Sequence, residues 1–260
     1  MLSNPDGGRL RFFRRATDKG PRSQRPRRGV SLLPSLFTMG NMWCGYASVV
    51  YSLRGEYGTA APLIGIAYLL DALDGRLARM TGTESEFGLQ LDSLADVISF
   101  GIAPAVMSFA WGLSSLGRLG WAAGFMFVAC AAMRLARFNV ISTKGADKRY
   151  YVGMPSPAAA AVPAATVYMY PYGLYDYRAA LPALLMVLLP AALMVSTIRY
   201  RSFKDLDLKS RRSFRVLVII AAGIVAVATH PKLVLLVAAY TYLASGFVGL
   251  AWSRFKQPAT

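Results

Sequence analysis

The sequence predicts an all-α polytopic membrane protein with about eight transmembrane helices and both termini in the cytoplasm. Of its 260 residues, 55% are hydrophobic and only 16% are charged, well below the roughly 25% charge of typical soluble domains. Apolar segments close to the roughly 20 residues that a transmembrane helix needs recur from one end of the chain to the other. Basic residues are concentrated in alternate loops between these segments, which is the pattern of cytoplasmic loops.

Eight apolar segments account for most of the chain, and the seventh is short. In order they are 33–53, 59–79, 91–111, 119–140, 156–173, 180–197, 216–229 and 233–253. With the N-terminus inside, the cytoplasmic side holds 25 Lys and Arg, and the outer side keeps only Arg54, Arg118, Arg178 and Lys232. An odd number of spans would spoil this alternation, so the count favours eight.

The first 30 residues form a basic tail that we expect to be disordered. They hold nine Lys or Arg and no apolar stretch of the kind found in secretory signals. Such a tail can attract anionic lipid or simply fix the orientation of the first helix. A formal net charge of +16 could indicate binding to nucleic acid or to an anionic membrane surface. The high hydrophobicity favours the membrane, so we expect no nucleic-acid partner. Cys44 and Cys130 form no paired thiol motif.

Four aspartates interrupt the second and third apolar segments: Asp71, Asp74, Asp92 and Asp96. An Asp near the centre of a transmembrane helix costs about 2.5 to 3.5 kcal/mol, so some interaction must offset their burial. The first pair is spaced by three residues and the second by four, which places each pair on one helix face. The short connection 80–90 makes the two helices antiparallel neighbours, so the two faces can meet.

Four converging carboxylates would repel one another in a low dielectric unless cations are bound. Ligation by oxygen alone suits Mg²⁺ or Mn²⁺. Gly75 lets a ligand approach the backbone, Ala78 leaves room on the next turn, and Arg79 offers a planar fork for phosphate oxygens. Gly88 permits close helix crossing. Small residues often serve packing alone, but together with the paired acids they indicate a metal and diphosphate site.

These residues carry a resemblance to a known family, the CDP-alcohol phosphotransferases. The signature D-x2-D-G-x2-A-R-x8-G-x3-D-x3-D is matched with every spacing intact, by Asp71, Asp74, Gly75, Ala78, Arg79, Gly88, Asp92 and Asp96. The resemblance implies a helical-bundle membrane enzyme that transfers a substituted phosphate from a CDP-linked donor to an alcohol and releases CMP. It also implies two divalent metals and suggests a homodimer.

The same resemblance implies roles for single residues. All four aspartates are expected to bind metal, and Asp96 is also expected to be the catalytic general base. Gly75, Ala78 and Arg79 are expected to contact the nucleotide of CDP-diacylglycerol and Ser85 its diphosphate, and Gly88 is expected to belong to the same binding site. Thr38, in the segment 34–38 that resembles the start of the family's first helix, is expected to touch the CDP moiety; alternatively, its hydroxyl only satisfies its own backbone.

Two later segments resemble those of bacterial and archaeal phosphatidylserine synthases within this superfamily. These are Arg134-Leu-Ala-Arg137-Phe-Asn139 and the stretch 153–160, which contains Ser156. Arg134 or Arg137 is expected to bind the carboxylate of serine bidentately, with Asn139 and Ser156 nearby. The alternatives are positive-inside anchoring for the arginines and an ordinary helix start for Ser156.

The sequence therefore predicts an integral phosphatidyltransferase that makes phosphatidylserine and CMP from CDP-diacylglycerol and L-serine. Its expected location is a cell membrane, most simply the bacterial cytoplasmic membrane, with the active site toward the cytoplasm. A sister enzyme that makes phosphatidylglycerophosphate or a phosphatidylinositol phosphate would share the signature. A cation-coupled transporter would also carry intramembrane acids, but it leaves the Gly, Ala and Arg positions unexplained.

Three parts are expected along the chain. Residues 1–30 form the basic tail, and residues 31–200 form a six-helix catalytic core. Residues 201–260 add a basic loop and two further transmembrane helices.

Overall fold

A computed structural model describes residues 32–82, 85–142, 150–201 and 213–255. Each of the eight predicted apolar segments is helical over most of its length, so the predicted helices are confirmed, although the helices of the fifth and sixth segments end at Met169 and Val195, before the predicted ends at 173 and 197. The predicted basic tail lies outside the described residues. The helices, in chain order, are α1 (Leu32–Leu53), α2 (Tyr57–Thr81), α3 (Glu86–Asp96), α4 (Ala103–Trp111), α5 (Arg118–Ser142), α6 (Ser156–Met169), α7 (Tyr177–Val195), α8 (Ser213–Thr229) and α9 (Pro231–Phe255).

The third predicted segment is one continuous helical stretch of mixed type. A π-helical segment, η1 (Val97–Ile102), joins α3 to α4 without a break, and a short 3₁₀ turn, η2 (Leu113–Leu116), follows α4. π-helical turns inside α-helices are frequently found at functional sites. This one begins directly after Asp96.

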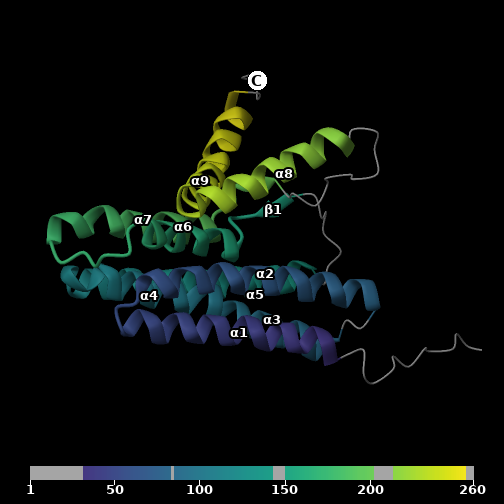
Figure 1. Ribbon diagram of the computed structural model, residues 1–260, viewed down its shortest axis with the longest axis horizontal. Helices are drawn as coiled ribbons and strands as arrows, with labels where there is room; N and C mark the ends of the chain where they lie inside the picture. Colours follow the sequence, from purple (N-terminus) through teal and green to yellow (C-terminus); the bar gives the residue numbers. More distant parts are fainter. Residues whose placement is uncertain (1–31, 83–84, 143–149, 202–212, 256–260) are drawn as a thin grey trace, which may run out of the picture.

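Figure 1 shows α1 to α5 as a block of helices that run in similar directions, with α6 and α7 lying along one side of it. α1 packs most extensively against α2, and α5 packs against α7. α9 leans on α6 but rises from the block at a steep angle (Figure 1). The axes of α8 and α9 therefore differ from those of the bundle that precedes them.

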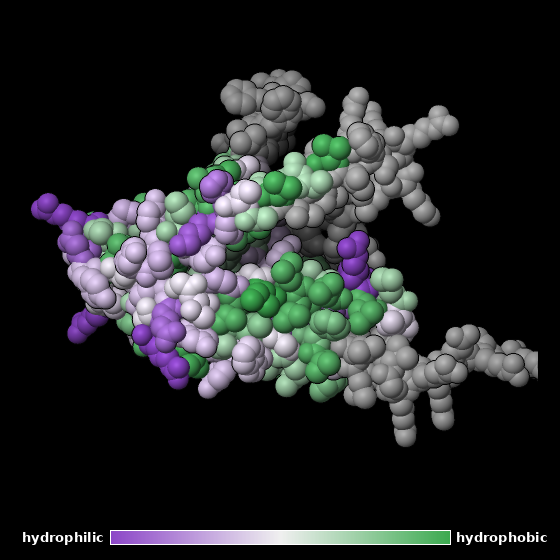
Figure 2. Space-filling view, in the orientation of Figure 1, coloured by the Kyte–Doolittle hydropathy of each residue, from purple (hydrophilic) through white to green (hydrophobic). Residues whose placement is uncertain are grey.

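Small residues dominate the contacts inside this bundle. Ala60, Ala67, Ala103, Ala131 and Ala159 are all fully buried, and small side chains let helix backbones approach closely in membrane proteins. The outer surface is apolar instead, since large hydrophobic side chains are widely exposed. Figure 2 shows hydrophobic side chains across the middle of the block and hydrophilic ones gathered toward its left end.

Three helical stretches in the described part of the chain are long and apolar enough to cross a membrane. They are Glu86–Trp111, Arg118–Val140 and Tyr177–Val195, and Pro231–Phe247 is a shorter apolar helix. With the outward-facing hydrophobic side chains, they indicate a helical membrane protein. The count of eight crossings and the position of the termini stay predictions.

One feature departs from the all-α expectation. Two short strands, β1 (Tyr150–Val152) and β2 (Arg199–Arg201), pair antiparallel with Tyr151 opposite Tyr200. They connect the segment before α6 to the segment after α7, where backbone groups outside the helices need partners. Helical periodicity carries no signal for this pairing.

Only a few residues separate the end of α2 from the start of α3. α2 ends at Gly82, which adopts the left-handed conformation with φ of 63°, a conformation that glycine adopts without penalty. α3 begins at Ser85, whose hydroxyl accepts a hydrogen bond from the Gly88 N–H at 3.0 Å. The aspartates of α2 and α3 consequently lie on either side of one short connection.

Candidate active site

The carboxylates of α2 and α3 converge as their spacing predicts. One oxygen from each of Asp71, Asp74 and Asp92 can be chosen so that all three lie within 4.8 Å of one another. Asp74 is buried, and Asp71 and Asp92 are half-buried. Asp96 lies outside this group of three, one turn further along α3, and is also buried.

α1 supplies a hydrogen-bond donor to each end of the carboxylate set. The Thr38 hydroxyl donates to Asp74 Oδ2 at 2.9 Å, and Asn41 Nδ2 donates to Asp96 Oδ1 at 3.4 Å. Thr38 and Asn41 are three residues apart, so they share the face of α1 that meets α2 and α3. Contact between Thr38 and a CDP moiety stays a prediction.

α5 and α6 contribute a cation and a hydroxyl. Arg134 Nη1 donates to Ser156 Oγ at 2.6 Å, and its guanidinium also stacks on Phe138, with 5.6 Å to the ring centroid. The Arg134 charge acts on the carboxylates of both Asp71 and Asp96. Two of the residues predicted to bind serine are thus in contact and adjoin the acidic cluster.

The other two residues predicted to bind serine lie differently. Asn139 Nδ2 donates to Ser93 Oγ at 2.9 Å and so ties α5 to α3 beside Asp92. Arg137 is exposed, although it shares a helix face with Arg134 by spacing. The helix period does not distinguish the two arginines. Their burial and contacts do, because Arg134 is half-buried and bonds to Ser156 whereas Arg137 is exposed.

The residues predicted to contact CDP-diacylglycerol follow the end of α2 and the start of α3. A Cβ added to Gly75 would meet nothing within 4 Å, so there is open space beside the backbone next to Asp74. Ala78 is half-buried and Arg79 is exposed. Ser85 caps α3 through Gly88, a structural role that sequence reasoning did not assign to it. Their contacts with the nucleotide stay predictions.

Two polar residues at the site escaped sequence reasoning. Asn41 is fully buried and bonds to Asp96; the signal that could have revealed it is a polar amide in an apolar segment, three residues after Thr38. Ser93 accepts from Asn139 and donates to the Leu89 carbonyl at 3.0 Å, and it directly follows Asp92. Ser93 lies on α3 with Asp92 and Asp96, and Asn41 lies on α1, which packs against α3.

The donor set fits divalent cations. Carboxylates this close together in a partly buried site repel one another strongly unless a cation neutralises them. Asp92 Oδ1 is buried without a hydrogen-bond partner, as expected of a ligand atom described without its ion. All the available atoms are carboxylate oxygens, which suit hard cations such as Mg²⁺.

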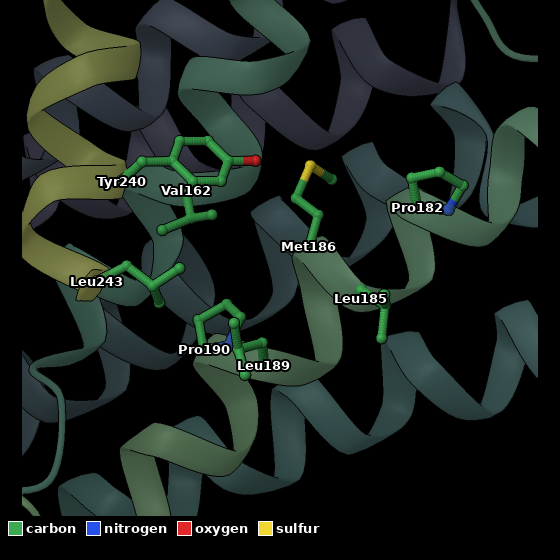
Figure 3. Close-up of a pocket in the computed structure, with 8 residues that line it drawn as sticks. All are labelled: Val162, Pro182, Leu185, Met186, Leu189, Pro190, Tyr240 and Leu243. Carbon is green, nitrogen blue, oxygen red and sulfur yellow. The ribbon is translucent and has the colours of Figure 1, made fainter. Parts of the chain in front are cut away.

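A separate cavity of about 180 Å³ lies between α6, α7 and α9. Figure 3 shows Tyr240 and Leu243 of α9 facing Val162 of α6 and the side chains of α7 across it. Its lining is apolar apart from the Tyr240 hydroxyl, which bonds to Thr166 Oγ1 at 3.0 Å. No residue predicted for the active site lines it, and it offers no group for phosphate chemistry.

The fold and the site together define a class: a helical membrane protein in which two adjacent helices hold an oxygen-only cluster suited to divalent cations. Within that class the chain belongs to the CDP-alcohol phosphatidyltransferase family, whose model matches residues 31–198. The resemblance carried by the aspartate signature is therefore confirmed.

Known relatives refine this placement. The CDP-diacylglycerol–serine O-phosphatidyltransferase of Helicobacter pylori is 38% identical over 191 residues, which cover 73% of this chain and 80% of the relative. The protein of the same name from Mycobacterium leprae is 43% identical over 142 residues, or 52% of this chain and 47% of its own. The archaetidylserine synthase of Methanothermobacter thermautotrophicus is 35% identical over 170 residues, or 65% and 69%.

Proposed function

We propose that this chain is a membrane phosphatidyltransferase that makes phosphatidylserine and CMP from CDP-diacylglycerol and L-serine. The observation that carries the proposal is the convergence of Asp71, Asp74 and Asp92 within 4.8 Å, in a chain of this family. The relatives named above are called serine phosphatidyltransferases or, in the archaeal case, an archaetidylserine synthase, which supports serine as the alcohol.

The aspartates and the end of α2 form the donor side of the proposed site. Asp71, Asp74 and Asp92, with Asp96 adjacent, would hold two divalent cations, Mg²⁺ or Mn²⁺, and the bound cations supply the positive charge that neutralises the donor's diphosphate. The open space beside Gly75 gives the nucleotide access to the backbone, next to Ala78 and Arg79. Thr38 orients Asp74 through its hydrogen bond. Ser85 and Gly88, which are joined by a hydrogen bond at the start of α3, would contact the donor from the other helix.

Asp96 is the proposed general base. It stands apart from the group of three and is held by Asn41. The hydroxyl oxygen of serine forms a bond to the β-phosphorus of the donor, the bond from that phosphorus to the oxygen bridging to CMP breaks, and the hydroxyl proton passes to Asp96. CMP leaves with the bridging oxygen.

Arg134 is the proposed ligand of the serine carboxylate. It is half-buried, bonds to Ser156 and acts electrostatically on two of the aspartates, so a zwitterion bound there lies beside the base. A guanidinium can hold a carboxylate with two parallel hydrogen bonds. Ser156 orients Arg134 through its hydrogen bond, and Asn139 holds α5 against α3 through Ser93. The exposed Arg137 adds positive charge near the site.

The alternation of basic residues supports eight crossings with both termini in the cytoplasm. The aspartates would then face the cytoplasm, where the nucleotide and serine are available, while the acyl chains stay in the bilayer. We extend the proposal to a bacterial cytoplasmic membrane and, from the family resemblance, to a homodimer.

The test is release of CMP from CDP-diacylglycerol by purified protein in detergent or vesicles with Mg²⁺ or Mn²⁺. L-serine is compared with glycerol phosphate, inositol phosphate and no alcohol. Serine should give the fastest release with formation of phosphatidylserine. Faster release with a phosphorylated alcohol would overturn the acceptor assignment and leave the chemistry intact. Ion flux across vesicles with no CMP release would instead indicate a transporter.

A further inference from the structure

Asn41 is a fully buried amide on α1, beside Asp96. Its Nδ2 donates to Asp96 Oδ1 at 3.4 Å, and its backbone carbonyl accepts a hydrogen bond from the Ser99 hydroxyl at 2.9 Å. Asn41 thus contacts α3 through its side chain and η1 through its backbone.

The helix that carries Asn41 is held tightly against η1. A Cβ on Gly45, one turn after Asn41, would lie 2.8 Å from Ser99 Cα, so only glycine allows α1 and η1 to approach this closely. This contact fixes the backbone of Asn41 next to η1, which directly follows Asp96.

The amide has one unused group. Of the two polar atoms of the amide, only Nδ2 can donate to a carboxylate, so Nδ2 faces Asp96 and Oδ1 is the atom left over. Within the described part of the chain, Asn41 Oδ1 is one of three buried side-chain atoms without a hydrogen-bond partner, together with Asp92 Oδ1 and Tyr200 OH. Buried acceptors are nearly always paired in proteins, so a ligand that donates a hydrogen bond would complete this site.

We propose that Asn41 both positions Asp96 and selects an amino alcohol by accepting a hydrogen bond from its ammonium group. This inference rests on the proposed function. Serine carries two donors on adjacent carbons, the hydroxyl and the ammonium. The adjacent acceptors, Asp96 and Asn41 Oδ1, match that pair, with the hydroxyl directed to Asp96. Glycerol phosphate and inositol phosphate have no ammonium group.

The test compares serine with β-hydroxypropionate, which keeps the hydroxyl and the carboxylate but lacks the ammonium. The Asn41→Leu variant should raise the KM for serine roughly 10- to 150-fold, the range for loss of a hydrogen bond to a charged group. The inhibition constant of β-hydroxypropionate against serine should change by less than about threefold. The KM for CDP-diacylglycerol should stay near that of the parent, because the donor does not use this amide.

A matched control is Ser48→Ala. Ser48 is equally buried on α1, two turns further along, and its hydroxyl donates to the Ala60 carbonyl at 2.9 Å. Its loss removes a buried hydrogen bond from the same helix without touching the site, so both constants should stay near the parent's. An equal rise of the serine KM in Ser48→Ala and Asn41→Leu would overturn the proposal.

A second variant separates the two roles and covers the case in which Asn41→Leu does not fold. Asn41→Asp keeps the side-chain size and an acceptor for the ammonium but loses the donor to Asp96. Turnover should therefore fall while the serine KM stays within about threefold. The proposal fails if turnover is unchanged, or if β-hydroxypropionate and serine weaken equally in Asn41→Leu. A parent protein that releases no CMP with serine would overturn the proposed function itself.

Discussion

The two ends of the α1–α4 block treat their buried polar groups in opposite ways. At the end where α2 begins and α4 ends, Tyr57 OH donates to the Ala110 carbonyl at 2.7 Å, and Trp111 Nε1 donates to the Tyr170 carbonyl at 2.8 Å. At the other end, Asn41 Oδ1 and Asp92 Oδ1 are buried without partners. Satisfied polar groups hold the helices together, whereas unsatisfied ones indicate where ligands bind.

The two ends also differ in what they need to keep their buried polar groups stable. The aromatic end satisfies its donors with backbone carbonyls and needs nothing from outside the chain. The carboxylate end places carboxylates within 4.8 Å of one another, and their repulsion must be relieved by bound cations or by protonation. We therefore expect substitutions at the carboxylate end to lower activity, and substitutions at the aromatic end to lower the free energy of unfolding.

The largest expected effect is at the carboxylate end. Asp92→Asn keeps the size of the side chain but removes a charge from the cluster, and CMP release should fall by about 10⁴-fold or more, since a bound metal contributes several kcal/mol to the transition state. The measurement is CMP release across a titration of divalent cation. Asp71→Asn should behave in the same way.

The control for these variants is Asp176→Asn. Asp176 caps α7 at the opposite end, accepts from the Arg178 N–H at 3.3 Å, and Asn caps helices as well as Asp does. It should keep near-normal activity. Near-normal CMP release from Asp92→Asn would show that the cluster is not the metal site.

The next effect tests whether Asp96 differs from its three neighbours. Asp96→Asn should lower kcat by roughly 10²- to 10⁴-fold, the usual contribution of a general base, with a smaller change in the KM for CDP-diacylglycerol. Steady-state kinetics with the donor varied measure both. Equal changes in rate and donor affinity would make Asp96 chiefly a metal ligand.

A smaller effect distinguishes the two arginines of α5. Arg134→Lys keeps the charge but loses the planar fork, so the serine KM should rise about 10- to 150-fold, equivalent to roughly 1.5 to 3 kcal/mol for one charged contact. Arg137→Lys is the matched control because Arg137 is exposed, and it should shift the serine KM by less than about threefold. Reversal of this order would move the carboxylate site to Arg137.

The smallest effect on activity is expected at the aromatic end. Trp111→Phe removes the donor to the Tyr170 carbonyl, and the unpaired acceptor should lower the free energy of unfolding by about 1 to 3 kcal/mol. Thermal unfolding in detergent measures this loss, and the folded fraction should keep the parent's kcat/KM. Trp121→Phe, at a side chain that is 74% exposed, should change neither quantity. If Trp111→Phe lost activity but not stability, the proposal that the aromatic end serves stability and the carboxylate end serves activity would be wrong.

The helices, the placement of each aspartate pair on one helix face and the family could all be predicted from the amino-acid sequence. These are local properties, because hydrophobic runs and spacings of three or four residues depend only on the helix period. The eight-residue signature added family membership, which the match over residues 31–198 confirms. The number of membrane crossings and the role of each site residue stay predictions.

Which side chains meet across helices could not be predicted from the sequence and follows from the packed fold. The periodicity of α1 does not show that Asn41 reaches Asp96, and the spacing of Arg134 and Arg137 does not show that Arg134 alone bonds to Ser156. The pairing of β1 with β2 is likewise absent from the helical pattern. Such contacts depend on how close the helices approach and how they rotate against one another, and these are set by small residues such as Gly45 and by the packing of the whole bundle.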